Sequence, residues 1–313
     1  MIPLACACLV LPGLAWWAWL GRRREDPLIS LAHILGMGLT LIILLAQAGF
    51  ILGVHFSPTL VGVLLALFAL LAAGGLLKKG FHLRRHHWAY LAVGLPLLAL
   101  AITWRLYQAR DLLLPNWVDS QHHFLIIQSI LENRGLPADL SPHLPVPFYY
   151  HFGYHAVAAL FTALSGLPLG RAMLILGQAL NALIGLSVYA LGKSLWSNWR
   201  PALVAALLVS FASRMPAYYL SWGRYTLTVG LILLPLAMAL AIDLLRGKYR
   251  WRGALTLGLL TAGLLLTHYF AALLLAAFLG LLAILQVARG IHRTPHMVMR
   301  LARILNSAAL GLL

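Results

Sequence analysis

Charged side chains are scarce in this sequence. Asp, Glu, Lys and Arg make up 10% of its 313 residues, whereas hydrophobic residues make up 62%. Soluble globular domains carry roughly 25% charged residues and about 45–50% apolar ones. A soluble fold of this length has too little polar surface to cover so much apolar area. The composition therefore excludes a soluble enzyme, a disordered chain and a collagen-like chain, and it predicts an integral protein of the cell membrane.

Cysteine is nearly absent as well. The two cysteines, Cys6 and Cys8, lie two positions apart within the first apolar run. On a helix this spacing points the two thiols in different directions, so we expect no disulfide between them. A small scaffold held together by disulfides is excluded.

Acidic residues are the rarest charged class. There are seven of them against 23 Lys and Arg, which gives a net charge of +16. A strongly basic chain can indicate nucleic-acid binding. Here, however, the basic residues stand in short clusters between apolar runs, which is the pattern of membrane insertion. We therefore expect membrane lipid as a partner and no nucleic acid.

The apolar runs predict the fold class. A bilayer core about 30 Å thick is crossed by roughly 20 apolar residues. We find runs of this kind at about 4–20, 28–54, 58–77, 88–107, 171–192, 201–219, 225–245, 253–269 and 270–288. They predict an all-α polytopic bundle of about 9–10 transmembrane helices. A last run begins near residue 304 and stops after ten residues, so we expect a chain truncated at its C-terminus.

The basic clusters predict which ends of these helices face the cytoplasm. Most basic residues fall in alternate loops, from 22–24 to 289–303. By the positive-inside rule these loops are cytoplasmic, and the long segment 108–168 lies outside. This assignment treats 148–164 as a juxtamembrane or re-entrant helix, because counting it as a span would place the later basic loops outside. Four of the seven acids lie in the external segment: Asp111, Asp119, Glu132 and Asp139.

Within this segment, Asp119, His122 and His123 stand at positions i, i+3 and i+4 of a predicted helix. They would share one face, opposite an apolar stripe, and project toward an aqueous cavity. Asp119 is either the N-cap of that helix or a reactive carboxylate. Zinc binding by the three is disfavoured, because neighbours on one helix need a distant further ligand.

Five further residues are expected on the same side. His151 and His155, at i and i+4, lie among tyrosines that either form an interfacial belt or line a site. Arg214 and Arg224 lie on the side that the positive-inside rule disfavours, and they either reach lipid headgroups or grip a lipid-linked phosphate. His268, at a third external turn, is either a buried structural histidine or another phosphate contact.

The order and spacing of these segments resemble the GT-C glycosyltransferases, which are membrane enzymes that use polyprenyl-phosphate sugars. They include protein mannosyltransferases, aminoarabinose transferases and oligosaccharyltransferases. The resemblance covers roughly residues 88–290. It is carried by WVDSQHHFLIIQSILENRGLP, PVPFYYHFGYHAVAALFTALSG, NALIGLSVYALGKSLW, SRMPAYYLSWGRYT and LLLTHYF.

The resemblance implies a GT-C-like catalytic module over 88–313, whose external loop 108–168 contains juxtamembrane helices, preceded by a three-helix module over 1–87. It implies transfer of a sugar from a polyprenyl-phosphate donor to an acceptor on the extracytoplasmic face. Asp119 matches the acid that acts as general base or orients the acceptor. We expect the other groups to contact substrate or phosphate: His122, His123, His151, His155, Arg214, Arg224 and His268.

The sequence departs from one branch of the resembled family. Oligosaccharyltransferase-like members carry acidic metal ligands in the second external loop, and here 213–226 holds no carboxylate. We therefore expect no cofactor and a mechanism without a divalent metal. Two alternatives stay open at this point, which are a non-catalytic GT-C-like scaffold or lipid-binding subunit, and a polytopic transporter. The sequence sets neither the sugar nor the acceptor.

Overall fold

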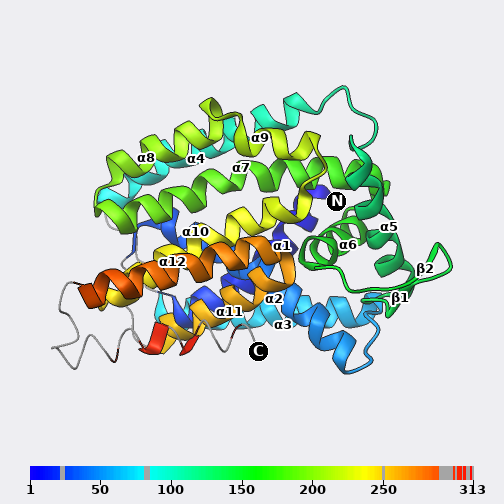
Figure 1. Cartoon of the computed structure of the whole chain (residues 1–313), viewed down its shortest axis with the longest axis horizontal. Coiled ribbons are helices and arrows are strands. Elements are labelled where there is room, and N and C mark those ends of the chain that lie inside the picture. Colours follow the sequence, from blue (N-terminus) through cyan, green and yellow to red (C-terminus); the bar gives the residue numbers. More distant parts are fainter. Residues whose placement is uncertain are drawn as a thin grey trace.

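The computed structural model describes residues 1–21, 25–80, 85–248 and 251–288, together with 299, 302–304, 306–307 and 311. Over these residues the chain is almost entirely helical (Figure 1). The helices are α1 (Ile2–Leu20), α2 (Pro27–Ile51), α3 (Pro58–Lys79), α4 (Arg85–Gln108), α5 (Val118–Asn133), α6 (Gly153–Ser165), α7 (Leu169–Trp196), α8 (Trp199–Leu207), α9 (Arg214–Ser221), α10 (Tyr225–Leu245), α11 (Trp251–Thr267) and α12 (Tyr269–Ala288). A π-helical turn, η1 (Leu208–Ala212), separates α8 from α9, and a short antiparallel hairpin joins β1 (Asp139–Leu140) to β2 (Leu144–Pro147).

Eight helical stretches among the described residues are long and apolar enough to cross a membrane, which confirms the expected polytopic all-α bundle. They are Ile2–Leu20, Pro27–Ile51, Pro58–Lys79, His87–Gln108, Leu169–Trp196, Trp199–Ser221, Tyr225–Leu245 and Tyr269–Gln286. The expected run 253–269 forms α11, which is apolar but shorter, at 17 residues. The expected run beyond residue 304 lies mostly outside the described residues.

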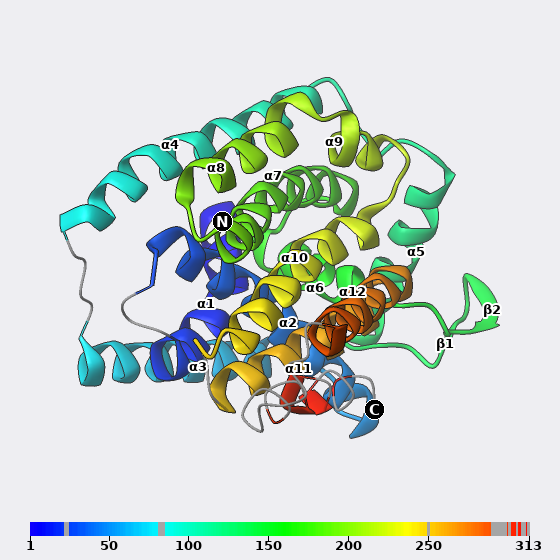
Figure 2. The same ribbon diagram turned by 60° about the vertical axis from the view of Figure 1, so that its left-hand side comes forward.

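The long helices run side by side, with α10 near the centre and α3 at the edge (Figures 1 and 2). In the most apolar window of α10, 83% of residues are buried within the protein, against 11% in α3. A helix that is apolar on every side and packed on every side belongs to the core, whereas an exposed apolar helix faces lipid. One hydrophobic core includes side chains of α1, α2, α7, α10 and α11, so α1 and α2 share the core of the later helices.

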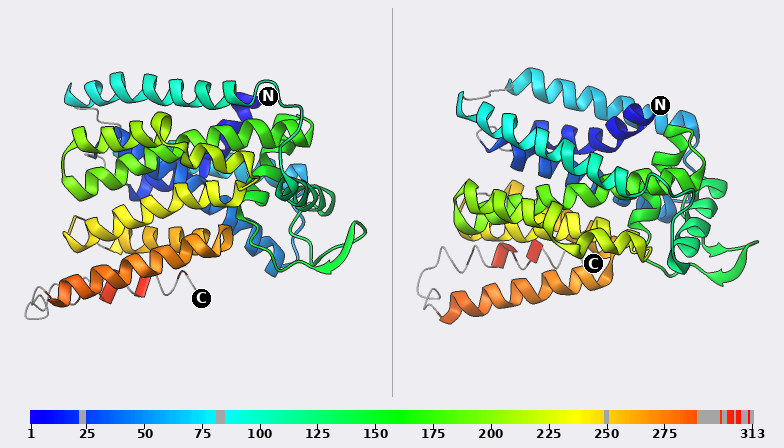
Figure 3. Two further views of the ribbon diagram at one scale, coloured as in Figure 1. Left: turned by 45° about the horizontal axis from the view of Figure 1, so that its top comes forward. Right: turned by 90° about the horizontal axis from the view of Figure 1, so that it is seen from above.

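The two ends of the bundle differ. The elements between α4 and α7, which are α5, the β1–β2 hairpin and α6, lie together at one end (Figures 1 and 3). The other end holds helix termini that carry basic side chains, including Lys79, Arg85, Lys193, Arg246 and Arg252. The cluster at 22–24 lies outside the described residues. These basic helix ends lie away from the segment that carries most of the acids, although a second set of arginines stands at helix ends on the acidic side: Arg105, Arg134, Arg171, Arg214 and Arg224.

The segment 148–164, interpreted from the sequence as a helix that does not cross, forms α6. At 13 residues it is too short to cross a bilayer. Its side chains are buried on nearly every face, from Tyr154 and His155 near its start to Ser165 at its end. It packs against α1, α2, α5, α7, α10 and α11, so protein surrounds it at the end of the bundle. Such enclosure is the condition under which a short buried helix is tolerated at membrane depth.

Candidate functional site

The start of α5 and the start of α10 meet in an ion pair. Asp119 lies in the first turn of α5, and Arg224 directly precedes α10. Its Nη1 atom lies 3.0 Å from Oδ2 of Asp119, and the two side chains are 52% and 34% exposed. The pair is therefore open to solvent at the end of the bundle that carries α5 and α6. Arg224 has further N–H groups free to bind a second anion.

A glycine allows this close approach. Gly223 adopts a positive φ of 67°, a conformation that costs glycine little because it has no Cβ. A Cβ added there would lie 2.8 Å from the backbone nitrogen of Ser120 and 3.0 Å from Cβ of Asp119. The turn before α10 can thus lie directly on the first turn of α5 only because this position carries no side chain.

A pair of histidines lies beneath the ion pair. Nδ1 of His123 is 2.8 Å from Nε2 of His155, and the residues are 3% and 0% exposed. Their surroundings are aromatic, with the rings of Tyr154 and Tyr225 about 6 Å from His123. Burial lowers the pKa of His123 to about 4 and that of His155 well below its usual value. Both imidazoles are therefore neutral at pH 7, so one donates the hydrogen bond and the other accepts it.

A second histidine pair joins the turn between α11 and α12 to the segment before α6. His151 lies with its Nε2 atom 3.2 Å from Oγ1 of Thr226, and its ring centre is 5.0 Å from that of His268. The ring of Tyr150 stacks on His151 at 3.9 Å. Burial lowers the pKa of His151 to about 4 and also lowers that of His268, where the charge of Arg224 adds to the effect. These imidazoles can act as neutral hydrogen-bonding groups beside the guanidinium.

The structure thus brings together six of the eight residues that the sequence analysis selected. They are Asp119, His123, His151, His155, Arg224 and His268. The remaining two, His122 and Arg214, make no hydrogen bond or ion pair with these six among the described residues. His122 is exposed on α5, and the guanidinium of Arg214 stacks over the ring of Tyr218, 4.4 Å from its centre.

One geometric expectation was wrong for His123. It does not share an exposed face with Asp119 and His122, because it lies on the buried side of α5 with Ile126, Ile127 and Ile130. The i, i+4 spacing from Asp119 is kept, but this stripe faces the bundle and only its first member reaches solvent. Because His155 is fully buried, it cannot contact a substrate phosphate directly. We therefore interpret His155 and His123 as residues that position α5.

Several residues of the cluster were missed from the sequence. Tyr150 and Thr226 both contact His151, and Gly223 supports the ion pair. The tyrosines had been interpreted as candidates for an interfacial belt, and a threonine at the start of an apolar run carries no signal of its own. Gly223 was detectable in principle, since a glycine next to a candidate arginine often marks a turn.

No group of three or more His, Cys, Asp or Glu side chains is placed to share a metal ion in the part of the chain that the structure describes. The carboxylate of Asp119 pairs with Arg224 and does not form the zinc site with His122 and His123 that the sequence analysis disfavoured.

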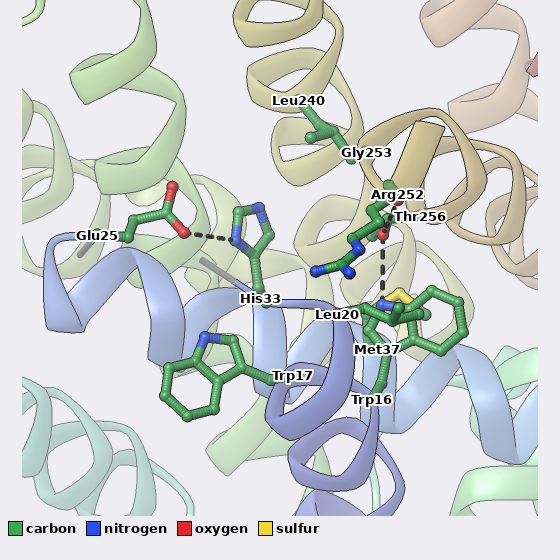
Figure 4. A pocket seen from close by; sticks show the side chains of 11 residues that line it. Trp16, Trp17, Leu20, Glu25, His33, Met37, Leu240, Arg252, Gly253 and Thr256 are labelled. Atoms are coloured by element: carbon green, nitrogen blue, oxygen red, sulfur yellow. Dashed lines mark hydrogen bonds and ion pairs between the residues drawn. The ribbon is translucent and has the colours of Figure 1, made fainter. Parts of the chain in front are cut away.

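A small pocket with several polar side chains lies at the opposite end of the bundle (Figure 4). In it Oε2 of Glu25 lies 3.6 Å from Nδ1 of His33, and the side chain of Arg252 projects between His33 and Thr256. The indole of Trp16 donates a hydrogen bond of 3.3 Å to Thr256. The pocket measures about 30 Å³, which is far below the 300–1,000 Å³ of typical ligand sites. The ion pair of Asp119 and Arg224, by contrast, is partly open to solvent.

The fold and the cluster define a polytopic all-α membrane protein with a polar, partly exposed site at one end of its bundle. A family model described as a family of unknown function (DUF6541) matches residues 6–313, and the chain belongs to this family. Searches among curated proteins and among solved structures found no match.

Proposed function

We propose that this protein is a membrane glycosyltransferase that moves a sugar from a polyprenyl-phosphate donor to an acceptor. The observation that carries the proposal is the exposed pair of Asp119 and Arg224 above a layer of neutral histidines. A carboxylate and a guanidinium held side by side are the two groups that this transfer needs. The resemblance to GT-C glycosyltransferases over 88–290 adds the substrate class.

In the proposed reaction, the acceptor hydroxyl oxygen attacks the anomeric carbon and its proton passes to Asp119. The bond between the anomeric carbon and the phosphate oxygen breaks, and the electron pair leaves with the polyprenyl phosphate. Arg224 stabilises the charge on that phosphate through N–H groups that Asp119 does not occupy. Direct displacement inverts the anomeric centre.

The histidines have two roles in this proposal. His151 and His268 lie next to Arg224 and are neutral, so they can donate hydrogen bonds to the phosphate or to sugar hydroxyls without competing for the proton of the acceptor. His123 and His155 anchor α5 from within, which fixes the carboxylate that accepts the proton.

We place the site on the extracytoplasmic side. The described helix termini at the opposite end of the bundle carry Lys79, Arg85, Lys193, Arg246 and Arg252. Basic ends of transmembrane helices favour the cytoplasm. The end with α5 and α6 then faces outward, where a lipid-linked sugar and an extracytoplasmic acceptor would meet.

The test is transfer from radiolabelled polyprenyl-phosphate pentoses and hexoses by the full chain in vesicles, with an envelope extract as the source of acceptors. Asp119→Asn keeps the size of the side chain but removes the base, so we expect transfer to fall by about 100-fold or more. The matched control is Asp111→Asn, because Asp111 is an exposed acid of the same segment, 80% accessible and paired with Arg110. Near-normal transfer by the Asp119→Asn variant would refute the assignment, whereas donor binding without transfer in the wild type would favour a non-catalytic lipid-binding subunit.

A further inference from the structure

A large apolar cavity lies at the end of α5 that is remote from Asp119. It has a volume of about 430 Å³, within the range of ligand sites. Its walls come from α1, α2, α3, the last turn of α5 and α6, and they are formed almost entirely by aliphatic side chains and Phe56 and Phe68. Since α3 packs mainly on α1 and leaves most of its surface exposed, this wall borders the surrounding lipid.

Arg134 is the single charged residue among the described residues that line the cavity. It follows α5 directly in a left-handed conformation with φ of 51°, and its side chain is exposed. Among the described residues its guanidinium makes no ion pair and no hydrogen bond. Arg134 therefore offers an unused positive charge at the end of an apolar cavity.

The neighbouring loop holds the backbone at Arg134. The backbone nitrogen of Phe56, in the turn between α2 and α3, donates a hydrogen bond of 2.6 Å to the carbonyl of Arg134. Nδ1 of His55 lies 2.7 Å from the carbonyl oxygen of Asn133. The turn thus joins α2 and α3 to the end of α5 and closes the cavity at the level where α5 ends.

We propose that this cavity binds one acyl chain of an anionic phospholipid from the surrounding bilayer leaflet, with the lipid phosphate on Arg134. The apolar walls match a hydrocarbon chain, and the guanidinium matches a phosphate. A peptide is a poor occupant because these walls offer almost no partner for backbone N–H and C=O groups. The negative headgroup supplies the counter-charge that Arg134 lacks among the described residues.

This lipid site is separate from the proposed donor site. Asp119 and Arg134 lie at opposite ends of α5, about 22 Å apart by the rise of an α-helix. The proposal rests on the cavity and on Arg134, so it holds or fails independently of the transfer chemistry at Asp119.

The first experiment is photo-crosslinking of the full chain in phosphatidylcholine vesicles that contain a phosphatidylglycerol with a diazirine on one acyl chain. We expect the label on peptides of α3 and α6, displaced by unlabelled phosphatidylglycerol. Arg134→Gln should reduce capture about fivefold, the weight of one basic residue near an anionic lipid, and Arg134→Lys should retain most of it. The matched control is Arg110→Gln, since Arg110 is an exposed arginine that is already paired with Asp111.

A cavity-filling variant gives a second measure. A Cβ added at Gly62, on the α3 wall, would have no heavy atom within 4 Å, so Gly62→Trp should place an indole in the cavity and reduce capture several-fold. Gly280→Trp is the control, because Gly280 is equally uncrowded but lies on α12. Gel filtration in detergent would show whether both variants fold.

The thiol of Cys8 reports occupancy without altering the cavity walls. Cys8 is a buried free cysteine that lines the cavity, and Cys6→Ser leaves it as the sole thiol of the chain. We expect phosphatidylglycerol to slow maleimide labelling of Cys8 at least threefold relative to phosphatidylcholine alone. Labelling spread over all exposed helices, capture unaffected by Arg134→Gln, or equal protection by phosphatidylcholine would overturn the proposal. Stronger capture of a photoreactive polyprenyl phosphate would overturn the occupant we name.

Discussion

The hydrogen bond of 2.8 Å between Nδ1 of His123 and Nε2 of His155 joins α5 to α6 inside the protein. Helix α6 is enclosed by long helices of the bundle, whereas α5 lies across its end. Asp119 stands four residues, about one helical turn, before His123 on the same face of α5. The histidine pair therefore holds α5, and with it the exposed carboxylate of Asp119, in a fixed position on the bundle.

This pair predicts how stability depends on pH. The pKa of His123 is about 4 in the folded protein, against about 6.5 for an unperturbed histidine. Because the folded pKa is lowered, the stability that depends on the neutral form is complete above pH 6.5 and is lost as the pH falls toward 4. For His123 the loss amounts to about 3 kcal/mol over this window. Thermal or denaturant unfolding of the protein in detergent at pH 7.5, 6 and 5 would measure it.

His123→Asn keeps a hydrogen-bonding group near the position of Nδ1 and removes the titration, so its stability should vary less with pH between 6.5 and 4. His122→Asn is the matched control, since His122 is the exposed neighbour on the same helix. An unchanged pH dependence in the His123→Asn variant would show that other groups control acid unfolding.

Thr226 supports the second histidine pair through its hydroxyl, which lies 3.2 Å from Nε2 of His151. Thr226→Val preserves shape and removes this hydrogen bond, at a cost of about 1 kcal/mol. Since His151 then loses its fixed orientation beside His268, we expect the KM for the lipid-linked donor to rise about fivefold with a smaller change in kcat. Thr228→Val is the control, because its hydroxyl donates to the carbonyl of Arg224 one turn earlier and to none of the histidines in the described part of the chain. Equal effects of the two variants on KM would argue against a role for His151 in donor binding.

The fold could be predicted from the sequence wherever hydrophobic length decided it. Runs such as 28–54 and 225–245 correspond to α2 and α10 within a few residues, because a bilayer demands about 20 apolar residues of any crossing helix. The shorter α6 was recognised less directly, through the charge pattern of the loops around it. The position of each helix in the bundle was not predictable. The sequences of α3 and α10 are similarly apolar, yet α3 lies at the edge of the bundle and α10 at its centre.

For the candidate site, the sequence supplied residue types but not their partners. Asp119 and Arg224 were each selected, and their ion pair depends on Gly223; the sequence could mark Gly223 as a turn but not its contact with the first turn of α5. The periodicity around His123 also led to a wrong prediction. A histidine is a polar residue and was expected on the exposed face, but His123 lies among isoleucines and is buried. Side-chain contacts between distant segments are set by tertiary packing, which local spacing does not encode.

Arg224 is predicted to act on the donor phosphate. Arg224→Gln should lower kcat/KM for the lipid-linked sugar by roughly 100-fold, because the leaving phosphate loses its charged donor. Arg224→Lys should recover only part of this, since an ammonium cannot form the two-pronged contact of a guanidinium. Folding should change little, because exposed ion pairs contribute only about 0–1 kcal/mol. The measurement is steady-state transfer together with thermal unfolding, and Arg214→Gln, which alters an exposed arginine outside the cluster, should leave both unchanged.

Gly223 and Gly53 allow the strain of a positive φ to be separated from crowding at the site. Their φ angles are 67° and 64°, so alanine at either position pays a similar conformational cost of about 1 kcal/mol. At Gly53 an added Cβ has no heavy atom within 4 Å, whereas at Gly223 it would press on Ser120 and Asp119. Gly223→Ala should therefore be the less stable variant and should also displace the carboxylate, with transfer reduced tenfold or more for a misplacement of about 1 Å. Gly53→Ala should lose only the stability that the positive φ costs an alanine, and it should retain transfer. Equal activity of the two alanine variants would contradict the idea that the site depends on contact between the turn at Gly223 and α5.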